Sequence, residues 1–181
     1  MRIISGKYKS RRFQLPKKFR ARPTTDMARE NLFNILNNKF DWESTHALDL
    51  FSGTGSVAIE LVSRGCPRVV CVESNTKNYA FIQHVKEQLD ATELLTIKAD
   101  VFSYIKTCNQ TFDLIFADPP YDLKELDTIP SKIFELELLN ENGIFILEHS
   151  KEDSFIEHPL FKEERKYGSV HFSFFAKDSV I

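Results

Sequence analysis

The middle of the chain alternates short apolar runs with stretches of helical spacing, and this alternation limits the fold more than any other feature. Each apolar run has the length of a strand that is covered on both faces, which is typical of a parallel sheet. Strand–helix alternation requires right-handed crossovers and so predicts a doubly wound α/β sheet. The predicted strands are His46–Phe51, Arg68–Glu73, Leu94–Ala99, Phe112–Asp118 and Gly143–Glu148. The predicted helices are Ser56–Ser63, Asn75–Leu89, Val101–Thr107 and Thr128–Leu139.

The N-terminal segment is basic and is predicted to form a hairpin. Residues 1–22 contain nine Lys or Arg and no acidic residue, so this segment carries +9. The remaining 15 basic and 26 acidic side chains give the rest of the chain −11. Alternating apolar residues around the turn signal Ser5-Gly6 predict a β-hairpin over residues 2–15, and Thr25 is expected to cap a helix that begins near Asp26. The charge asymmetry indicates a polyanionic partner or, failing that, a solvated arm.

The length of the chain fits one domain. At 181 residues it can bury a core but is too short for a second domain of full size. Leu160–Lys166 and Ser169–Phe175 predict a terminal antiparallel pair. No apolar run approaches the roughly 20 residues of a membrane span, so we expect a cytoplasmic protein without a membrane partner. We expect residues 1–22 to be a basic extension and residues 23–181 the main domain of one compact unit.

Neither the cysteines nor the histidines have the spacing of a metal site. The three cysteines lack a Cys-x-x-Cys pair, which argues against both a zinc site and a disulfide framework. The five histidines are scattered, and each is interpreted as a surface or packing residue. No metal is therefore predicted. These residues are Cys66, Cys71, Cys108, His46, His84, His149, His158 and His171.

A glycine-rich loop follows the first predicted strand. Residues 49–56 read Asp-Leu-Phe-Ser-Gly-Thr-Gly-Ser, and the two glycines allow a tight turn and a close approach to a ligand. Ligands of open α/β sheets bind beyond the carboxyl ends of the strands, where this loop is expected. Gly53-x-Gly55-x-x-Ala58 with Glu73 also satisfies the dinucleotide pattern, so a nicotinamide cofactor stays open at this point.

Three acidic residues stand after predicted strands or at their ends. Asp49 precedes the loop and can orient a cofactor's amino group or the loop amides. Glu73 can accept from ribose hydroxyls, and Asp100 can accept from an adenine amino group. Taken singly, Glu73 and Asp100 are equally compatible with a loop carboxylate or a helix N-cap. Together they favour S-adenosylmethionine.

The fourth predicted strand runs into the sequence Asp118-Pro119-Pro120-Tyr121. Two prolines fix φ and remove two backbone donors, so neither strand nor helix can continue. The Asp118 carboxylate and the Pro119 carbonyl can grip the N–H groups of an exocyclic amine, while Tyr121 offers a face on which a base can stack. This pattern predicts methyl transfer to an amino nitrogen. Methylation at a ring carbon fits less well, because no Pro-Cys pair stands at this corner.

These motifs resemble the RsmD family, whose members methylate the exocyclic N2 of a guanine in bacterial small-subunit ribosomal RNA. The resemblance covers nearly the whole chain. It rests on residues 2–11, 22–26, 29–36, 49–55 and 112–121. Ser5 and Ser52 depart from it mildly, since alanine is expected at both positions.

The resemblance implies a class I methyltransferase fold, an α/β Rossmann-like sheet of seven strands with a C-terminal antiparallel pair and an N-terminal β-hairpin extension. It also implies roles for individual residues. The expected catalytic residues are Asp118, Pro119, Pro120 and Tyr121. The expected binding residues for S-adenosylmethionine are Asp49, Phe51, Gly53, Gly55, Glu73, Ser74, Asp100, Val101 and Asp118. The expected RNA-binding residues are Arg2, Lys7, Lys9, Arg11, Arg12, Arg22 and Thr24.

The expected partner is small-subunit ribosomal RNA, naked or in an assembled particle, and no obligate protein partner is evident. A DNA adenine-N6 methyltransferase fits the same corner but would call for a separate recognition domain. A release-factor glutamine methyltransferase usually carries Asn where Asp118 stands. An NAD-dependent oxidoreductase would use the glycine loop without a reason for the Asp-Pro-Pro-Tyr corner, and a catalytically dead RNA-binding domain would not need the acidic residues.

Overall fold

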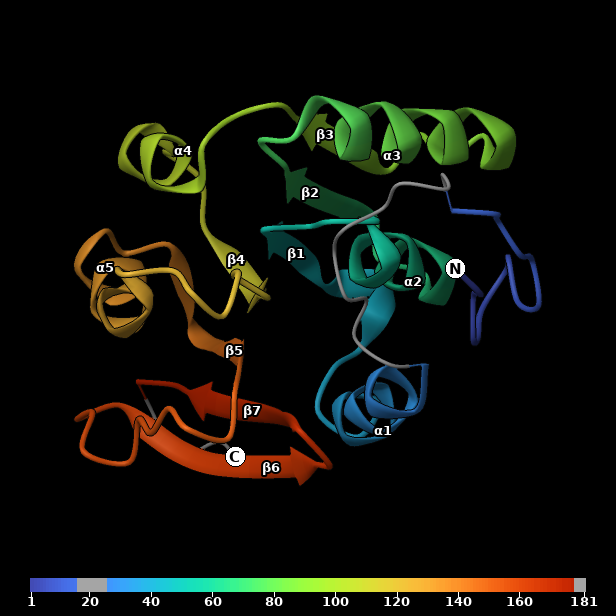
Figure 1. Ribbon diagram of the computed structural model, residues 1–181. Coiled ribbons are helices and arrows are strands. Elements are labelled where there is room, and N and C mark those ends of the chain that lie inside the picture. Colours follow the sequence, from blue (N-terminus) through green and yellow to red (C-terminus); the bar gives the residue numbers. More distant parts are fainter. Residues whose placement is uncertain (16–25, 178–181) are drawn as a thin grey trace.

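The computed structural model describes residues 1–15 and 26–177. Its centre is one seven-stranded sheet in the order β3-β2-β1-β4-β5-β7-β6 (Figure 1). β1 to β5 run parallel, and β7 joins β5 and β6 in antiparallel pairs. The strands are β1 His46–Leu50, β2 Arg68–Val72, β3 Leu94–Ile97, β4 Phe112–Ala117, β5 Leu139–His149, β6 Phe161–Tyr167 and β7 Val170–Phe175. The predicted mixed sheet is confirmed, including its terminal antiparallel pair.

Helices cover both faces of the sheet. α1, α2 and α3 pack against one face and α4 and α5 against the other, so each face has its own apolar core (Figure 1). The helices are α1 Asp26–Leu36, α2 Ser56–Arg64, α3 Thr76–Leu89, α4 Val101–Thr107 and α5 Ile129–Glu135, with short 3-10 turns η1 Trp42–Ser44 and η2 Leu126–Thr128. Because both faces are covered, the inner strands are apolar along nearly their whole length, as the sequence indicated. Among the described residues, no helix is both long and apolar enough to cross a membrane.

Most predicted elements are confirmed to within one or two residues, but the boundary between α5 and β5 was predicted wrongly. The predicted helix Thr128–Leu139 stops at Glu135, and β5 begins already at Leu139. Glu137 adopts a φ of 51°, which ends helical geometry. The start of β5 pairs with Phe112 across a register shift, and that pairing claims an apolar segment whose spacing resembles a helix.

The N-terminal arm (residues 1–15) is a hairpin, but it has less β-structure than predicted. Its only bridge is the antiparallel pair Arg2–Arg12. Three backbone hydrogen bonds also cross it, in which the amides of Ile3, Ser10 and Phe13 donate to the carbonyls of Arg11 (3.0 Å), Ile3 (3.0 Å) and Met1 (2.9 Å). The predicted cap Thr25 lies outside the described residues, while the helix expected after it begins at Asp26.

The arm is bound to α2 by hydrogen bonds that satisfy its backbone. The amides of Ile4 and Ser5 donate to the carboxylate of Glu60 at 2.7 and 3.0 Å. The amide of Lys7 donates to the carbonyl of Ser63 at 2.7 Å. Glu60 is 1% exposed, and Arg64 donates to it from the next turn of α2 at 2.9 Å. A buried carboxylate held by three donors is a strong anchor.

Gly6 makes the closest approach in this contact. Its φ is +80°, and a Cβ at this position would lie 1.7 Å from the carbonyl oxygen of Ser63. We expect Gly6→Ala to lower the free energy of unfolding by at least about 2 kcal/mol, because the arm must move away from α2 and the residue must also adopt a left-handed conformation. Urea unfolding measures the change.

Gly168→Ala is the matched control. Gly168 has a similar φ of +66°, but nothing lies within 4 Å of the added Cβ. This variant is expected to lose only about 1 kcal/mol, the cost of the backbone conformation. Equal losses in the two variants would show that close packing of the arm on α2 contributes nothing to stability.

Candidate active site

The loops after β1, β2 and β4 meet at one edge of the sheet. β1 pairs with β2 on one side and with β4 on the other, with Leu50 opposite Val72 and Ala117. The backbone continues these pairings beyond the strands, since the amide of Ser52 donates to Val72 at 3.1 Å and that of Asp118 to Leu50 at 3.3 Å. The chain order reverses between β1 and β4, so this edge is the topological switch point at which open α/β sheets bind ligands.

In the loop after β1, every second residue from 51 to 55 has a left-handed backbone conformation. Phe51, Gly53 and Gly55 have φ values of 57°, 53° and 70°. Glycine adopts this region freely, whereas a bulky residue such as phenylalanine does so only when its surroundings enforce it. A Cβ on Gly55 would approach the side chain of Ile82 in α3 to 2.9 Å, whereas one on Gly53 would meet no described atom closer than 3.9 Å. Gly55 is thus required for packing, and Gly53 leaves its outer side open.

Asp49 lies beneath this loop and is 1% exposed. Its carboxylate accepts from the amide of Ala58 in the first turn of α2 at 3.2 Å. Burial raises the pKa of Asp49 to about 7, and the nearby charge of Glu73 adds to the rise, while the hydrogen bonds from Ala58 and Ser52 oppose it. The side chain therefore orients an amide in the first turn of α2, and the expected role of Asp49 toward a cofactor's amino group or the loop amides stays a prediction.

Glu73 connects the loop after β1 to the loop after β2. One carboxylate oxygen accepts from the amide of Gly53 at 2.8 Å, and the other accepts from the amide of Asn75 at 2.7 Å. The residue is 7% exposed. Glu73 thus holds the open glycine in place from the neighbouring strand. Ser74, the next residue, is exposed.

The loop after β3 has a different character. Asp100 is exposed and caps α4, because its carboxylate accepts from the amide of Ser103 at 2.9 Å. Val101 is buried at the start of α4. The ring of Phe102 meets that of Phe51 edge-on, with 6.3 Å between the centroids. The two aromatic rings therefore join the loops after β1 and β3.

The Asp118–Tyr121 corner follows β4 as expected. Asp118 is half-buried, Pro119 is buried, and Pro120 is exposed. Tyr121 is 42% exposed, and its hydroxyl donates to Glu148 of β5 at 3.4 Å. The sequence reasoning overlooked Glu148, a carboxylate that is 2% exposed beside this corner. The one available signal was an acidic residue near the end of an apolar strand.

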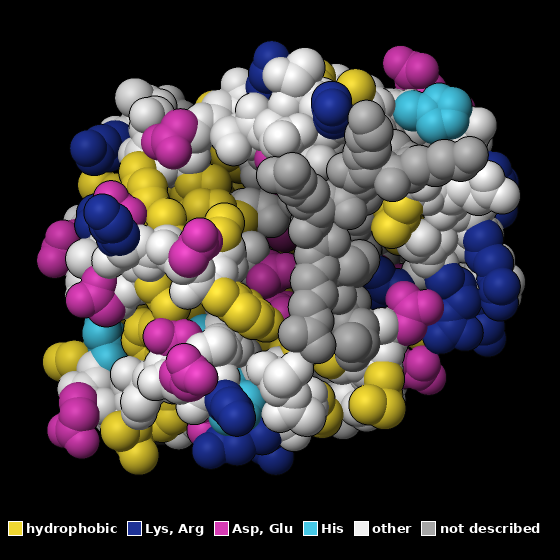
Figure 2. All heavy atoms as spheres, viewed as in Figure 1, with side chains coloured by type: hydrophobic (Ala, Val, Ile, Leu, Met, Phe, Trp, Pro, Cys, Tyr) yellow, Lys and Arg dark blue, Asp and Glu magenta, His cyan; other side chains and the backbone are white. Residues whose placement is uncertain are grey.

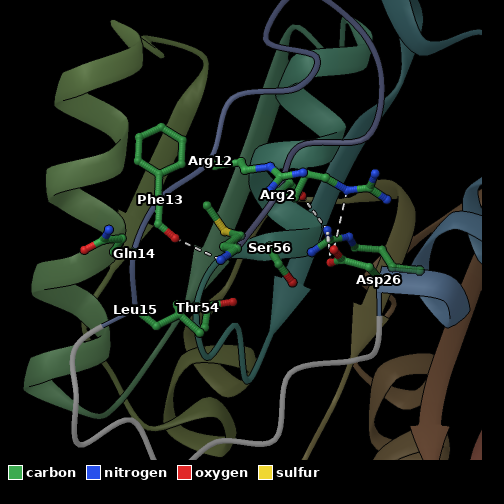
Figure 3. Close-up of a pocket in the computed structure, with 10 residues that line it drawn as sticks. Arg2, Arg12, Phe13, Gln14, Leu15, Asp26, Thr54 and Ser56 are labelled. Atoms are coloured by element: carbon green, nitrogen blue, oxygen red, sulfur yellow. Dashed lines mark hydrogen bonds and ion pairs between the residues drawn. The ribbon is translucent and has the colours of Figure 1, made fainter.

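A cavity of about 850 Å³ lies between the arm, α1 and the loop after β1 (Figure 3). Arg2, Arg12 and Arg29 line it together with Thr54 and Ser56 of the loop. Arg29 was not singled out from the sequence, yet its side chain is 1% exposed. Burial lowers the pKa of Arg29, although Asp26 and Glu60 oppose this. The arm and the glycine loop therefore share one basic cavity.

Some of the predicted RNA-binding side chains form ion pairs within the protein. Arg2 forms ion pairs with Asp26 and Glu30, both at 3.5 Å, and Lys7 forms one with Glu93. The other candidates in the arm, Lys9, Arg11 and Arg12, are exposed. Arg22 and Thr24 lie outside the described residues.

Exposed basic side chains gather where the arm crosses the surface. In Figure 2 the dark blue side chains form a group at the right-hand edge, where Figure 1 places the arm. The exposed basic residues of the arm are Lys7, Lys9, Arg11 and Arg12. Arg11 also donates to the carbonyl of Gln88 in α3 at 3.2 Å. The structure thus concentrates positive charge beside the candidate site.

Residues 1–176 match the family model described as "Conserved hypothetical protein 95". The chain is also 32% identical, over 97% of its length and 91% of the relative, to "Ribosomal RNA small subunit methyltransferase D" of Buchnera aphidicola. The chain belongs to the RsmD family. The Escherichia coli protein of the same name is 27% identical over 79% of this chain and 68% of its own length.

Solved structures agree with this RsmD-family fold. A hypothetical protein of Thermus thermophilus superposes with a TM-score of 0.86 at 23% identity, covering 97% of this chain and 99% of the other. A precorrin-6y C5,15-methyltransferase of Geobacter metallireducens superposes with a TM-score of 0.70 at 18% identity, covering 92% and 94%. The class I methyltransferase architecture that the resemblance implied is confirmed.

The buried carboxyl of Asp49 generates a prediction about stability and pH. The pKa of Asp49 is about 7 in the folded protein, whereas an aspartate exposed to water, as in the unfolded chain, has a pKa of 3.8. Between these two pH values the folded state therefore binds more protons than the unfolded state. The contribution of Asp49 to stability therefore falls as pH rises from about 4 to about 7 and is constant above that range. Asp49→Asn keeps an acceptor for Ala58 and removes this titration.

We expect the free energy of unfolding of Asp49→Asn, relative to the native protein, to increase from pH 4 to pH 7 by an amount on the order of a few kcal/mol. Denaturant unfolding at several pH values measures the difference. A constant difference across this range would show that Asp49 ionises in the folded state as it does in water.

Proposed function

We propose that the protein transfers a methyl group from S-adenosylmethionine to the exocyclic N2 of a guanine in small-subunit ribosomal RNA. The observation that carries the proposal is the position of the Asp118–Tyr121 corner after β4, directly beside the glycine loop after β1. Membership of the RsmD family and the name of the Buchnera relative support ribosomal RNA as the substrate. The protein is a methyltransferase, and its substrate class is RNA.

The residues of the site fit S-adenosylmethionine. Gly53 has an open outer side and is held by Glu73, which suits a loop that passes close to a ligand. Asp49 is a buried carboxylate with a raised pKa, the kind of group that a cationic ligand stabilises. When bound, S-adenosylmethionine supplies an electrophilic methyl group on a sulfonium. Glu73 and Asp100 would accept from the ribose and the adenine, and Phe51 with Val101 would enclose the adenine ring.

The corner after β4 would position the nucleophile. The N2 lone pair of guanine is delocalised into the ring, so the amine attacks only when it is held in a suitable geometry. Asp118 and the carbonyl of Pro119 would accept from its two N–H groups and stabilise the positive charge that develops on nitrogen. Tyr121 would stack on the base, and its hydrogen bond to Glu148 would hold the ring. The proton that nitrogen loses passes to Asp118 or to water.

The basic arm would bind the RNA backbone. Lysine and arginine attract phosphates of any sequence, while the corner selects the base, so the two elements divide affinity from specificity. The arm lies beside the glycine loop across the basic cavity, which would place the target nucleotide near the methyl donor. We propose the assembled small-subunit particle as the substrate, since it presents its bases on a preformed surface.

Asp118→Ala is expected to reduce methyl transfer by at least about a thousandfold while S-adenosylmethionine still binds with nearly native affinity, because the carboxylate acts on the acceptor amine. Asp122→Ala is the control, since Asp122 is an exposed carboxylate four residues further along the chain. Transfer of labelled methyl to small-subunit particles measures activity, and calorimetry measures cofactor affinity. Equal losses of both quantities would assign Asp118 to cofactor binding.

The substrate is tested by offering labelled S-adenosylmethionine with small-subunit particles, naked ribosomal RNA and DNA. Nucleoside analysis of the product is expected to find N2-methylguanosine. Label found in N6-methyladenosine instead would identify a DNA- or RNA-adenine enzyme. Cofactor binding without any transfer would support an RNA-binding protein that lacks activity.

Substituting Arg11 and Arg12 by glutamine is expected to weaken RNA binding and to reduce the slope of log affinity against log salt by about 1 to 2, because two phosphate contacts are lost. Filter binding over a series of salt concentrations measures both quantities. The matched control replaces Lys151 and Lys177, which are exposed and lie outside the arm. An unchanged slope in the arm variant would exclude the arm from the RNA interface.

A further inference from the structure

Three side chains that can bind a metal converge on the three strands at the β6 edge of the sheet. His149 ends β5, His171 lies opposite it on β7, and Glu164 lies on β6. These three strands are neighbours in the sheet (Figure 1). Oε1 of Glu164 is 3.0 Å from Nδ1 of His171 and 3.8 Å from Nε2 of His149. The three ligand atoms all lie within 4.8 Å of one another.

The position of the hydrogens on His149 is determined by its neighbour. Nδ1 lies 2.8 Å from the carbonyl oxygen of Ser150, which only accepts, so Nδ1 carries the proton and donates it. Nε2 therefore has a lone pair, which in this structure accepts from the hydroxyl of Ser173 at 2.8 Å and lies 3.8 Å from Oε1 of Glu164. Histidines that bind metals characteristically donate their second ring nitrogen to a backbone carbonyl in this manner, because the contact fixes both tautomer and orientation.

The distances suit a small transition metal ion. Zinc binds histidine nitrogen and carboxylate oxygen at about 2.0 to 2.2 Å, so the ligand atoms of a tetrahedral site lie about 3.3 Å apart. Two of the three separations, 3.0 and 3.8 Å, lie on either side of this value, and the third, between the two histidine nitrogens, is within 4.8 Å. Two histidines and one glutamate form a common zinc ligand set, in which water takes the fourth position.

Burial gives the cluster the rigidity that such a site needs. His149 is 0% exposed, and its ring packs edge-on against Phe155 with 5.0 Å between the centroids. His171 is 7% exposed, while the side chain of Glu164 is 23% exposed and leaves access from solvent. The cluster therefore has two rigid buried ligands, and its third ligand, Glu164, is reached from solvent.

We propose that His149, Glu164 and His171 form a binding site for a divalent transition metal ion of the zinc class, separate from the methyl-transfer site. His171 binds through Nδ1, so its ring proton resides on Nε2 in the bound form. The hydroxyl of Ser173, now 2.8 Å from Nε2 of His149, turns away when the ion binds. Lys166, whose ammonium lies 2.8 Å from the other oxygen of Glu164, is 63% exposed and swings into solvent.

The site would stabilise a part of the sheet that touches the active site. An ion at this position would add a link between β5, β6 and β7 to the antiparallel hydrogen bonds that pair β7 with β5 and with β6. Glu148, the neighbour of His149 on β5, accepts from the hydroxyl of Tyr121. Metal binding is therefore expected to raise thermal stability.

The experiment is a calorimetric titration of chelator-treated protein with Zn²⁺ alone, with thermal unfolding measured in parallel. We expect one Zn²⁺ per chain and a higher melting temperature. Glu164→Gln and His171→Asn are each expected to weaken Zn²⁺ binding by more than about tenfold. Glu164 is partly exposed on an edge strand, so its replacement is expected to leave the fold intact. Co²⁺ in place of Zn²⁺ is expected to give the visible absorption of a tetrahedral site.

Two variants are expected to bind Zn²⁺ at least as tightly as the native protein. His158→Gln removes a histidine that packs on Phe175 at 5.2 Å but is outside the cluster, and Ser173→Ala removes only the competing hydroxyl. Each variant is compared by its unfolding without metal, so that loss of binding is separated from loss of fold. The proposal is overturned if Zn²⁺ does not bind, or if it binds equally well to folded Glu164→Gln and His171→Asn proteins.

Discussion

The parallel pairing of β1 with β2 and with β4 places three loops of the candidate site, those after β1, β2 and β4. Because β1 lies between these strands, the glycine loop, Glu73 and the Asp118–Tyr121 corner all emerge at the same edge, although they are far apart in the sequence. Backbone hydrogen bonds continue the pairing past the strand ends, from Ser52 to Val72 and from Asp118 to Leu50. In the proposed function, the geometry of the sheet would thereby bring the methyl donor and the acceptor amine to adjacent loops.

Helix α2 connects this edge to the basic arm. Its first turn donates to the buried Asp49, and its later turns receive the arm through Glu60 and Ser63. The arm is thus held on the same helix that follows the glycine loop, across a cavity lined by arginines from the arm and α1. One helix therefore orients both the glycine loop and the arm that is proposed to bind RNA.

Buried carboxylates have separate tasks in this structure. Glu60 and Glu73 each accept from two backbone amides, so their charges are satisfied by hydrogen bonds. Asp49 accepts from one backbone amide and carries a raised pKa, which leaves it suited to a cationic ligand. In the proposed metal site, the partly exposed carboxylate of Glu164 is likewise surrounded by side chains, two histidines and a lysine.

The sequence by itself determined the α/β class, nearly all the strands and helices, the glycine loop and the Asp118–Tyr121 corner, because hydrophobic period and turn chemistry are local. It misplaced the end of α5, where pairing of β5 with β4 overrides a helix-like spacing. Only the tertiary structure decided that Arg2 and Lys7 are ion-paired, that Arg29 is buried at the cavity, and that His149 meets His171. These contacts join residues from separate elements, and strand register and helix docking, which no local pattern specifies, bring them together.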